Sequence, residues 1–134
     1  MNNAQFATAV HIMTMLARTG DSLSSAYIAG SININSSMVR ISLSVLSANG
    51  LIKSKEGKGG GNILAKAADK IVLSDIYTAV NNAYLLGKLN SPNPECNTGK
   101  QINDHLTHLY REVDRSMVKS LSTISLADFC SKFK

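Results

Sequence analysis

Four serines and one arginine fall on one side of a helix that the sequence predicts from Ser36 to about Asn49. At about 100° per residue, a polar arc roughly 100° wide is filled by Ser36, Ser37, Arg40, Ser44 and Ser47. Small hydroxyl residues let a backbone come close to DNA and can donate to phosphates, and the arginine fork pairs with the acceptor edge of guanine. An ordinary exposed helix face would instead favour Glu, Lys and Gln. The residues expected to contact the major groove are therefore Ser36, Ser37, Arg40 and Ser44.

The rest of this helix is almost entirely apolar. The circle outside the polar arc is filled mostly by Met38, Val39, Ile41, Leu43, Val45 and Leu46. We therefore expect the helix to bury a wide face and to show a narrow one.

A glycine-rich turn with lysines follows. Residues 56–61 contain four glycines, and the short segments 51–55 and 62–65 on either side predict two strands. Glycines at such a tip let it approach a phosphate backbone without obstruction by side chains. A flexible turn is the alternative, whereas a nucleotide-binding loop is excluded because the glycines open a strand and no Ser or Thr follows. The residues expected to contact phosphates or the minor groove are Lys55, Lys58, Gly59 and Gly60.

The two cysteines differ in their surroundings. Cys96 precedes the start of a predicted long helix, and Lys100 follows it. A helix N-terminus and a nearby cation both favour the reactive thiolate, so Cys96 is a candidate redox switch; a packing residue is the alternative. Cys130 stands beside aromatic residues and is interpreted as a buried small hydrophobic residue.

No set of residues indicates catalysis or a metal site. His105 and His108 are three residues apart on one helix, which suits a pair of metal ligands, but no third ligand accompanies them. No Ser–His–Asp, paired-carboxylate or Cys–His arrangement stands out. We therefore expect neither an enzyme nor a bound metal.

The order of elements that holds these residues predicts the fold. Helices are expected over 3–18, from Ala26 to Ile32, from Ser36 to Asn49, from a start seeded by Ser74, and from Thr98 to Leu121. We expect the first helix to end at Gly20, a tight turn over 33–35, and a capping box from Ser125 to Asp128. Two helices across a short turn, followed by a basic hairpin, form a winged helix-turn-helix pattern. The predicted fold class is mainly α, a winged helix-turn-helix with a small two-stranded β-wing and a long C-terminal helix.

Composition restricts the partners. The chain has 134 residues and a formal net charge of +5, and its basic excess lies in residues 1–90, which favours a polyanionic partner. Its apolar runs are far below the ~20 residues of a membrane span, and its start does not resemble a secretion signal. We therefore expect a cytoplasmic protein without a membrane partner.

Five segments carry a resemblance to a known family. In chain order they are LSANGLIKS (46–54), GKGGG (57–61), LAK (64–66), IVLSDIY (71–77) and SLAD (125–128). With them the sequence resembles the Rrf2 family of bacterial winged-helix regulators, and in particular a branch without an iron–sulfur cluster. Members with a cluster carry three cysteines around the start of the long helix, where this chain has only Cys96. We therefore expect no cofactor.

The resemblance implies a homodimer in which the long helices cross and both wings lie on DNA. Residues 1–86 would form the DNA-binding domain and 87–134 the hinge and dimerisation helices, with the helix over 3–18 packing against the latter. A stripe with spacings of three and four suits such helix pairing. The expected interface residues are Ile102, Leu106, Leu109, Val113 and Met117. A dimer would read a palindromic operator with half-sites about one turn apart.

The expected function is sequence-specific regulation of transcription, as a repressor. The signal remains open between a thiol switch, a small molecule and a protein effector. Two wing residues depart from the family, since Glu56 stands where many members have arginine and Asn62 where many have an aromatic residue. The alternative is therefore a winged-helix interaction module that regulates a partner enzyme and binds DNA weakly.

Overall fold

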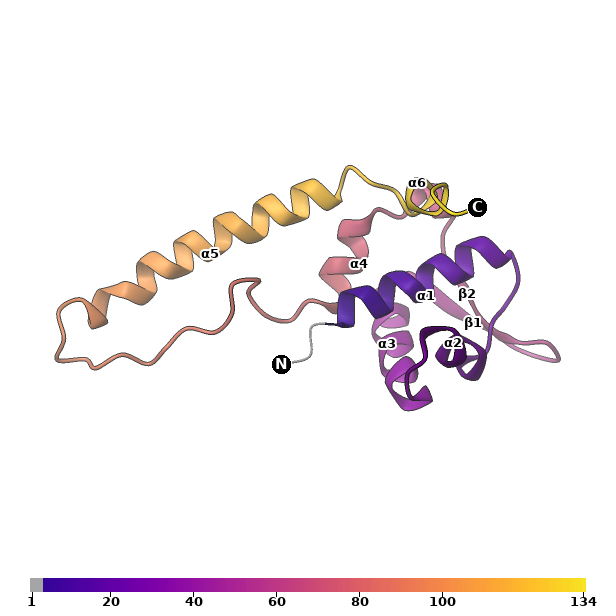
Figure 1. The fold of residues 1–134 in the computed structure, drawn as a ribbon, viewed down its shortest axis with the longest axis horizontal. Coiled ribbons are helices and arrows are strands. Elements are labelled where there is room, and N and C mark those ends of the chain that lie inside the picture. The colour runs from indigo at the N-terminus through magenta and orange to yellow at the C-terminus, as the bar shows by residue number, and fades with distance from the viewer. Residues whose placement is uncertain (1–3) are drawn as a thin grey trace.

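The computed structural model describes residues 4–134 and has a helical body with a protruding arm (Figure 1). The helices are α1 (Gln5–Thr19), α2 (Ser25–Ile32), α3 (Ser36–Ala48), α4 (Leu73–Val80), α5 (Gly99–Leu121) and α6 (Leu126–Cys130), with a short 3-10 turn η1 (Ala68–Lys70). The strands are β1 (Ile52–Lys55) and β2 (Gly61–Leu64). The arm consists of α5 and the segment 81–98. The predicted fold class, helical with a two-stranded wing, is confirmed.

Helix α1 lies at the centre of the body, where it contacts α2, α3, α4, α6 and β2. The largest fully buried side chains are Ile12, Met13, Ile28, Val39, Leu46, Ile71, Ile76 and Leu126. Burial of each of these aliphatic side chains contributes about 1.5–3 kcal/mol. The helix ends at Gly20, whose φ of 66° is left-handed as the sequence predicts. The first predicted residue of this helix, Asn3, lies outside the described residues.

Side-chain caps determine where the two helices of the helix-turn-helix begin. The hydroxyl of Ser24 accepts a hydrogen bond from the Tyr27 amide and thereby starts α2. Asn33 then adopts a left-handed φ of 63°, and the side chain of Asn35 caps α3 by accepting from the Ser37 amide at 2.8 Å. The tight turn over 33–35 is confirmed, and it fixes the direction in which α3 leaves α2.

The wing is anchored to the body by a third extended segment. Strands β1 and β2 pair antiparallel from Ile52–Leu64 to Lys55–Gly61. Leu23 forms an isolated bridge to Asn62, with main-chain hydrogen bonds of 3.1 and 2.8 Å, and the Asn62 side-chain amide also donates to the Leu23 carbonyl at 3.1 Å. A Cβ at Gly61 would lie 2.6 Å from that carbonyl oxygen, so this close approach requires glycine.

The arm is held together by contacts between its two components. The Leu85 amide donates to the carboxylate of Asp114 at 3.2 Å, and the Asn103 side chain donates to the Asn90 carbonyl at 2.9 Å. The rings of Tyr84 and Tyr110 meet edge to face with centroids 5.2 Å apart. Tyr110 is the buried residue of α5, so most of this helix is exposed or half-buried within the chain.

Helix α4 begins differently from the prediction. It starts at Leu73, and the carboxylate of Asp75 accepts from the Val72 amide at 3.0 Å. Ser74 does not cap the helix but is buried within its first turn. The predicted capping box of α6 is confirmed, since the Asp128 amide donates to the Ser125 hydroxyl at 2.9 Å. None of the described helices combines the length and hydropathy needed to cross a membrane.

Candidate nucleic-acid interface

The exposed side of α3 presents one free arginine. Arg40 is exposed and makes no hydrogen bond or ion pair with any described residue. Ser44, one turn further along, is also exposed and is unpartnered within residues 4–134. Both side chains are thus available to an external ligand, and the guanidinium keeps all five of its donors.

The two serines at the start of α3 are less available. Ser36 is half-buried. The Ser37 hydroxyl is exposed but donates to the side-chain oxygen of Asn35 at 2.7 Å, which uses its only hydrogen within the cap. Ser37 can therefore accept a hydrogen bond from a ligand but cannot also donate one to a phosphate without releasing the cap.

The exposed face of α3 is wider than the sequence suggests. The buried residues of this helix are Val39, Leu43 and Leu46, whereas Met38 is 47% exposed and Ile41 is 61% exposed. The expectation of a wide buried face was therefore wrong. The reason is that α1, α2 and α4 cover only one side of α3, so its apolar residues continue onto the uncovered side.

Ile41 is consequently a candidate contact that the sequence did not reveal. At about 100° per residue it lies roughly 40° from Ser37 and 60° from Ser44 around the helix. An apolar side chain in the major groove suits the methyl group of thymine. The available signal was the wheel angle itself, which places Ile41 next to the polar arc.

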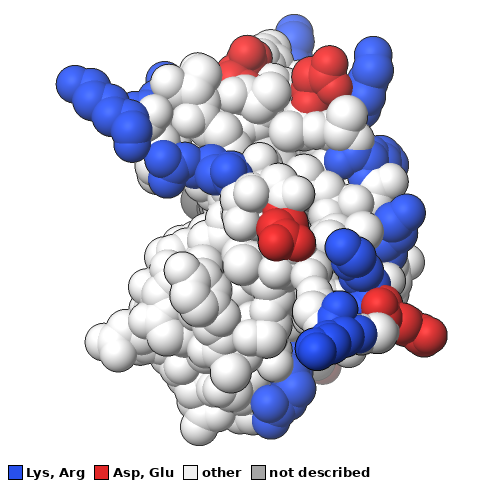
Figure 2. All heavy atoms as spheres, turned by 90° about the vertical axis from the view of Figure 1, so that its right-hand side faces the viewer, with Lys and Arg blue, Asp and Glu red and all other residues white. Residues whose placement is uncertain are grey.

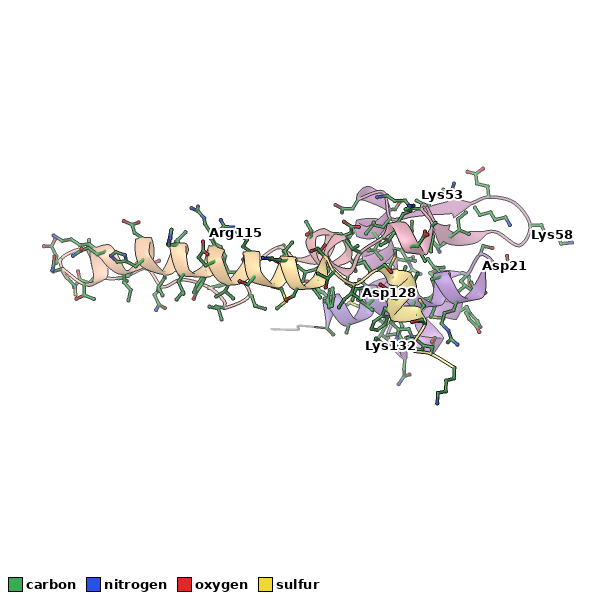
Figure 3. The ribbon with its side chains drawn as sticks, turned by 90° about the horizontal axis from the view of Figure 1, so that it is seen from above. Asp21, Lys53, Lys58, Arg115, Asp128 and Lys132 are labelled. Carbon is green, nitrogen blue, oxygen red and sulfur yellow. The ribbon has the colours of Figure 1, made fainter. Side chains whose placement is uncertain are left out.

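The wing presents three exposed lysines, Lys53, Lys55 and Lys58, and the sequence named the last two as contacts. Lys55 and Lys58 are exposed, and neither is paired within the described residues. Figure 3 shows Lys58 at the tip of the wing and Arg115 on the arm, well away from it. The ion pair found in residues 4–134 joins Arg115 to Glu112 on α5. Among the described residues no ion pair neutralises the lysines of the wing, and the exposed Glu56 offsets only part of their charge.

Hydrogen bonds shape the glycines of the wing tip. Gly59 has a left-handed φ of 77°, and its carbonyl accepts from the Ser22 hydroxyl. The Gly60 amide donates to the Gly57 carbonyl at 2.9 Å. The Gly60 amide is thus used inside the turn, whereas the Gly59 amide has no partner among the described residues and can donate to a phosphate.

The charge distribution on this end of the body supports an anionic partner. Figure 2 views the end that carries the wing, and Lys and Arg side chains gather mainly along the right-hand side of the face it shows. A broad area without charged side chains lies next to them. This combination provides electrostatic attraction beside a surface that can approach a groove closely.

The cysteines lie at opposite ends of α5. Cys96 is exposed, and its sulfur accepts a hydrogen bond from the amide of Gly99, the first residue of α5, at 3.4 Å. Cys130 in α6 is half-buried; burial raises the pKa of its thiol, and the Arg18 charge opposes part of that rise. Because a helix of 23 residues is roughly 33 Å long, the two cysteines are far too distant for a disulfide within one chain.

The predicted interface residues of α5 are not buried within the chain. Ile102 and Leu109 are 39% and 51% exposed, and Leu106, Val113 and Met117 are half-buried. Met117 also lines a pocket of about 680 Å³ with Tyr77. Burial raises the pKa of Tyr77, and the charge of Asp114 adds to the rise.

Comparisons with known proteins agree with this geometry. The profile of the Rrf2 family, described as an iron-dependent transcriptional regulator, matches residues 2–132. This chain belongs to the Rrf2 family. YwnA of Bacillus subtilis, described as an HTH-type transcriptional regulator, is 33% identical over 129 residues, 96% of each chain. Family members regulate transcription and are not enzymes, so this Rrf2 chain is a DNA-binding transcription regulator.

Solved structures show the same fold. A transcriptional regulator from Lactobacillus plantarum has a TM-score of 0.76 at 26% identity, covering 96% of this chain and 88% of its own. CymR, the global cysteine regulator of B. subtilis, has a TM-score of 0.72 at 20% identity, covering 100% of this chain and 98% of its own. At that identity the likeness to CymR concerns the fold alone.

The residues present do not fit an iron–sulfur cluster. A cluster takes about four ligands, mostly thiolates, and the chain has two cysteines, separated by the length of α5. Within residues 4–134, no three His, Cys, Asp or Glu side chains come together in a way that could hold a metal ion. His105 and His108 are both exposed on α5. The described residues therefore offer no ligand set that matches the iron in the family description.

Proposed function

We propose that this Rrf2 chain is a cytoplasmic homodimeric repressor that binds a palindromic DNA site. The observation that carries the proposal is that Arg40 on α3 and the lysines on the wing are all exposed and have no partner among the described residues. None of these side chains has a partner among the described residues that would compete with DNA. The proposed division of the chain is residues 1–86 for DNA and 87–134 for dimerisation.

Base reading and phosphate contact are assigned to different elements. Arg40 would pair with guanine and Ile41 would contact a thymine methyl. Lys55, Lys58 and the Gly59 amide would contact phosphates, which sets register without reading sequence. The small side chains of Ser36, Ser37 and Ser44 would let α3 approach the DNA closely. Gly60 would do the same for the tip of the wing, because it has no side chain.

The homodimer is supported by the apolar surface of the arm. The exposed large hydrophobic side chains of the arm are Tyr84, Leu85, Leu86, Ile102 and Leu109. Apolar groups gathered on one protruding element indicate an interaction site. A second copy of the chain would cover these residues by packing against the α5 stripe from Ile102 to Met117. Because such a dimer has two-fold symmetry, the DNA site that it binds would be palindromic.

A thiol signal is proposed for Cys96. Its exposure admits an oxidant, and its sulfur, which accepts a hydrogen bond from the Gly99 amide, lies directly before α5. Because Cys130 is out of reach, oxidation would give a sulfenic acid or a bond to another molecule. Either product would change the start of α5 and thereby the arm. Small-molecule and protein effectors are alternative signals.

Selection of binding sites from a random duplex library tests the proposal. The purified protein, reduced and then oxidised, should enrich a palindrome in the reduced state. Arg40→Ala should weaken binding to that site by about 1–3 kcal/mol and relax one base preference, whereas Arg115→Ala on the arm should leave base preference unchanged. Occupancy of the site should block transcription from an overlapping promoter in vitro.

Two outcomes would contradict this assignment. Unchanged specificity in Arg40→Ala would show that α3 does not read the groove through this residue. Failure to enrich any sequence in either redox state would favour the interaction module that binds a partner protein through the same fold.

A further inference from the structure

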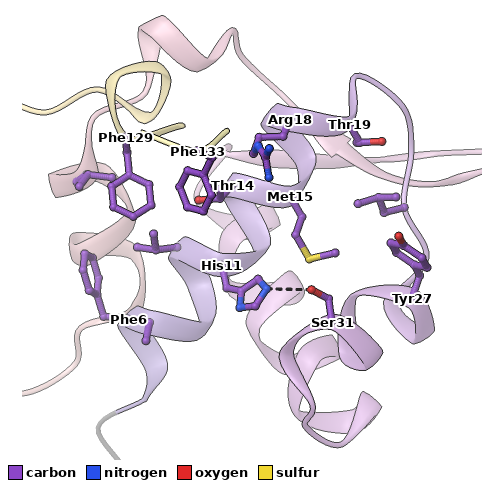
Figure 4. A pocket seen from close by; sticks show the side chains of 14 residues that line it. Phe6, His11, Thr14, Met15, Arg18, Thr19, Tyr27, Ser31, Phe129 and Phe133 are labelled. Atoms are coloured by element: carbon purple, nitrogen blue, oxygen red, sulfur yellow. Dashed lines mark hydrogen bonds between the residues drawn. The ribbon is translucent and has the colours of Figure 1, made fainter. Parts of the chain in front are cut away.

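The body has an open pocket that the proposed DNA surface does not use. It has a volume of about 760 Å³ and lies between α1, α2, α6 and the C-terminal residues (Figure 4). This volume falls within the range of small-molecule sites. Aromatic rings of Phe6, Tyr27, Phe129 and Phe133 line it, together with aliphatic side chains and Met15. The walls therefore suit an apolar ligand body.

Few polar groups face this pocket, and they come from α1 and α2. The imidazole of His11 is hydrogen-bonded to the Ser31 hydroxyl at 3.0 Å. Thr14 also lines the pocket and is only 6% exposed. Its hydroxyl lies beside the Cys130 thiol and helps to lower the pKa of that thiol, against the rise that burial causes.

The charge of the pocket is positive. Arg18 lies at its edge with the guanidinium 5.0 Å from the centre of the Phe133 ring, and it donates to the main-chain oxygen of Lys134 at 3.2 Å. No Asp or Glu belongs to the lining. Most of the guanidinium donors remain available, so the pocket complements an anion at the end where Arg18 lies.

We propose that this pocket binds an amphipathic organic anion, with a carboxylate or sulfonate at Arg18 and an aromatic or aliphatic body against the phenylalanines. The hydroxyl of Thr14, which also lines the pocket, would supply a second polar contact. A neutral apolar molecule would leave Arg18 and Thr14 unused, and a cation would face the guanidinium.

The position of the pocket gives the ligand a route to regulation, which rests on the proposed function. Helix α2 is the first helix of the helix-turn-helix, and it contributes Tyr27 and Ser31 to the lining. The His11–Ser31 hydrogen bond connects it to α1. A ligand body that fills the pocket would contact Tyr27 and Ser31 and shift α2 relative to α1, and α3 with it, because α2 and α3 pack together. Ligand binding should therefore weaken DNA binding.

Fluorescence titration without DNA tests the site on the whole chain. The probe is 8-anilinonaphthalene-1-sulfonate, an aromatic anion whose emission rises in apolar surroundings. Saturable binding should weaken about tenfold or more in Arg18→Gln and partly recover in Arg18→Lys. Arg115→Gln on α5 is the matched control and should bind as the parent does. Thr14→Val should weaken binding as well, by less than Arg18→Gln does.

A matched pair of competitors tests the charge requirement. 4-Phenylbutyrate should displace the probe at a concentration at least tenfold lower than 4-phenylbutyramide, and this preference should disappear in Arg18→Gln. Equal displacement by the two compounds, or equal probe binding in Arg18→Gln and Arg115→Gln, would overturn the anion site. Binding that falls as protein concentration rises would show that a second copy occupies the pocket instead.

DNA affinity tests the regulatory part separately. Saturating 4-phenylbutyrate should lower the affinity for the selected operator at least threefold in the parent and leave it unchanged in Arg18→Gln. A bound anion with no effect on DNA affinity would refute the regulatory role and keep the site. Anion binding by a protein that enriches no DNA sequence would instead refute the proposed function alone.

Discussion

Glycine-to-alanine changes at two positions should have opposite effects on stability. At Gly61 the new Cβ would lie 2.6 Å from the Leu23 carbonyl oxygen and 2.7 Å from its carbon. Both are backbone atoms, so the wing must move away from the body. The three hydrogen bonds between Leu23 and Asn62 would weaken or break. At about 1 kcal/mol each, less the roughly 0.4–1 kcal/mol gained from a stiffer unfolded chain, Gly61→Ala should cost about 2 kcal/mol.

Gly30→Ala is the control with the same chemical change. Gly30 lies within α2, and a Cβ there would meet nothing within 4 Å. Replacing glycine inside a helix by alanine stabilises it by about 0.5–1 kcal/mol. Urea unfolding at one fixed protein concentration measures both variants, since dimerisation makes apparent stability depend on concentration. A Gly61→Ala variant as stable as Gly30→Ala would refute the close approach of the wing to Leu23.

Three further predictions follow from the wing, the thiols and the last helix. Lys58→Ala should reduce the slope of log affinity against log salt by about 0.9 per wing, roughly 1.8 for a dimer, whereas Lys119→Ala on α5 should not; an unchanged slope would remove Lys58 from the phosphate contacts. Because burial raises the pKa of Cys130, iodoacetamide should alkylate exposed Cys96 first, and in Cys96→Ser the labelling rate should keep rising above the pKa of an ordinary thiol; a plateau at or below it, by mass spectrometry, would contradict this. Ser125→Ala should cost about 1 kcal/mol in urea unfolding because the cap of α6 is lost, and an unchanged midpoint would show that the cap contributes nothing.

Local signals were sufficient wherever one residue type satisfies one backbone need. Gly20 and Asn33 adopt left-handed conformations and end their helices, as the sequence predicts. Asn35 and Ser125 cap the helices that follow them. These features depend on neighbours within four residues, so the sequence contains the whole interaction. The predicted start of α4 was wrong because two nearby side chains could cap this helix. The sequence favoured the Ser74 hydroxyl, whereas in the structure the Asp75 carboxylate accepts from the Val72 amide.

Contacts between distant segments were not predictable in this way. The bridge between Leu23 and Asn62 joins residues 39 apart, and nothing in the pattern around Leu23 marks it as a partner of the wing. The pocket between α1, α2 and α6 likewise needs both ends of the chain. Only the folded arrangement brings Phe133 to Arg18, so sequence periodicity gave no indication of that site.

Apolar periodicity identifies surfaces that must be covered but not the molecule that covers them. Ile41 and Leu109 both belong to apolar arcs of their helices, and by periodicity alone both would enter the core of this chain. In the structure Ile41 is 61% exposed and Leu109 is 51% exposed, whereas Tyr110, adjacent to Leu109, is buried against Tyr84. The same hydrophobic free energy drives burial in a core, in a groove or in a second copy. The exposed apolar residues therefore indicate where this chain binds its partners. Ile41 lies on the proposed DNA surface and Leu109 on the proposed dimer surface.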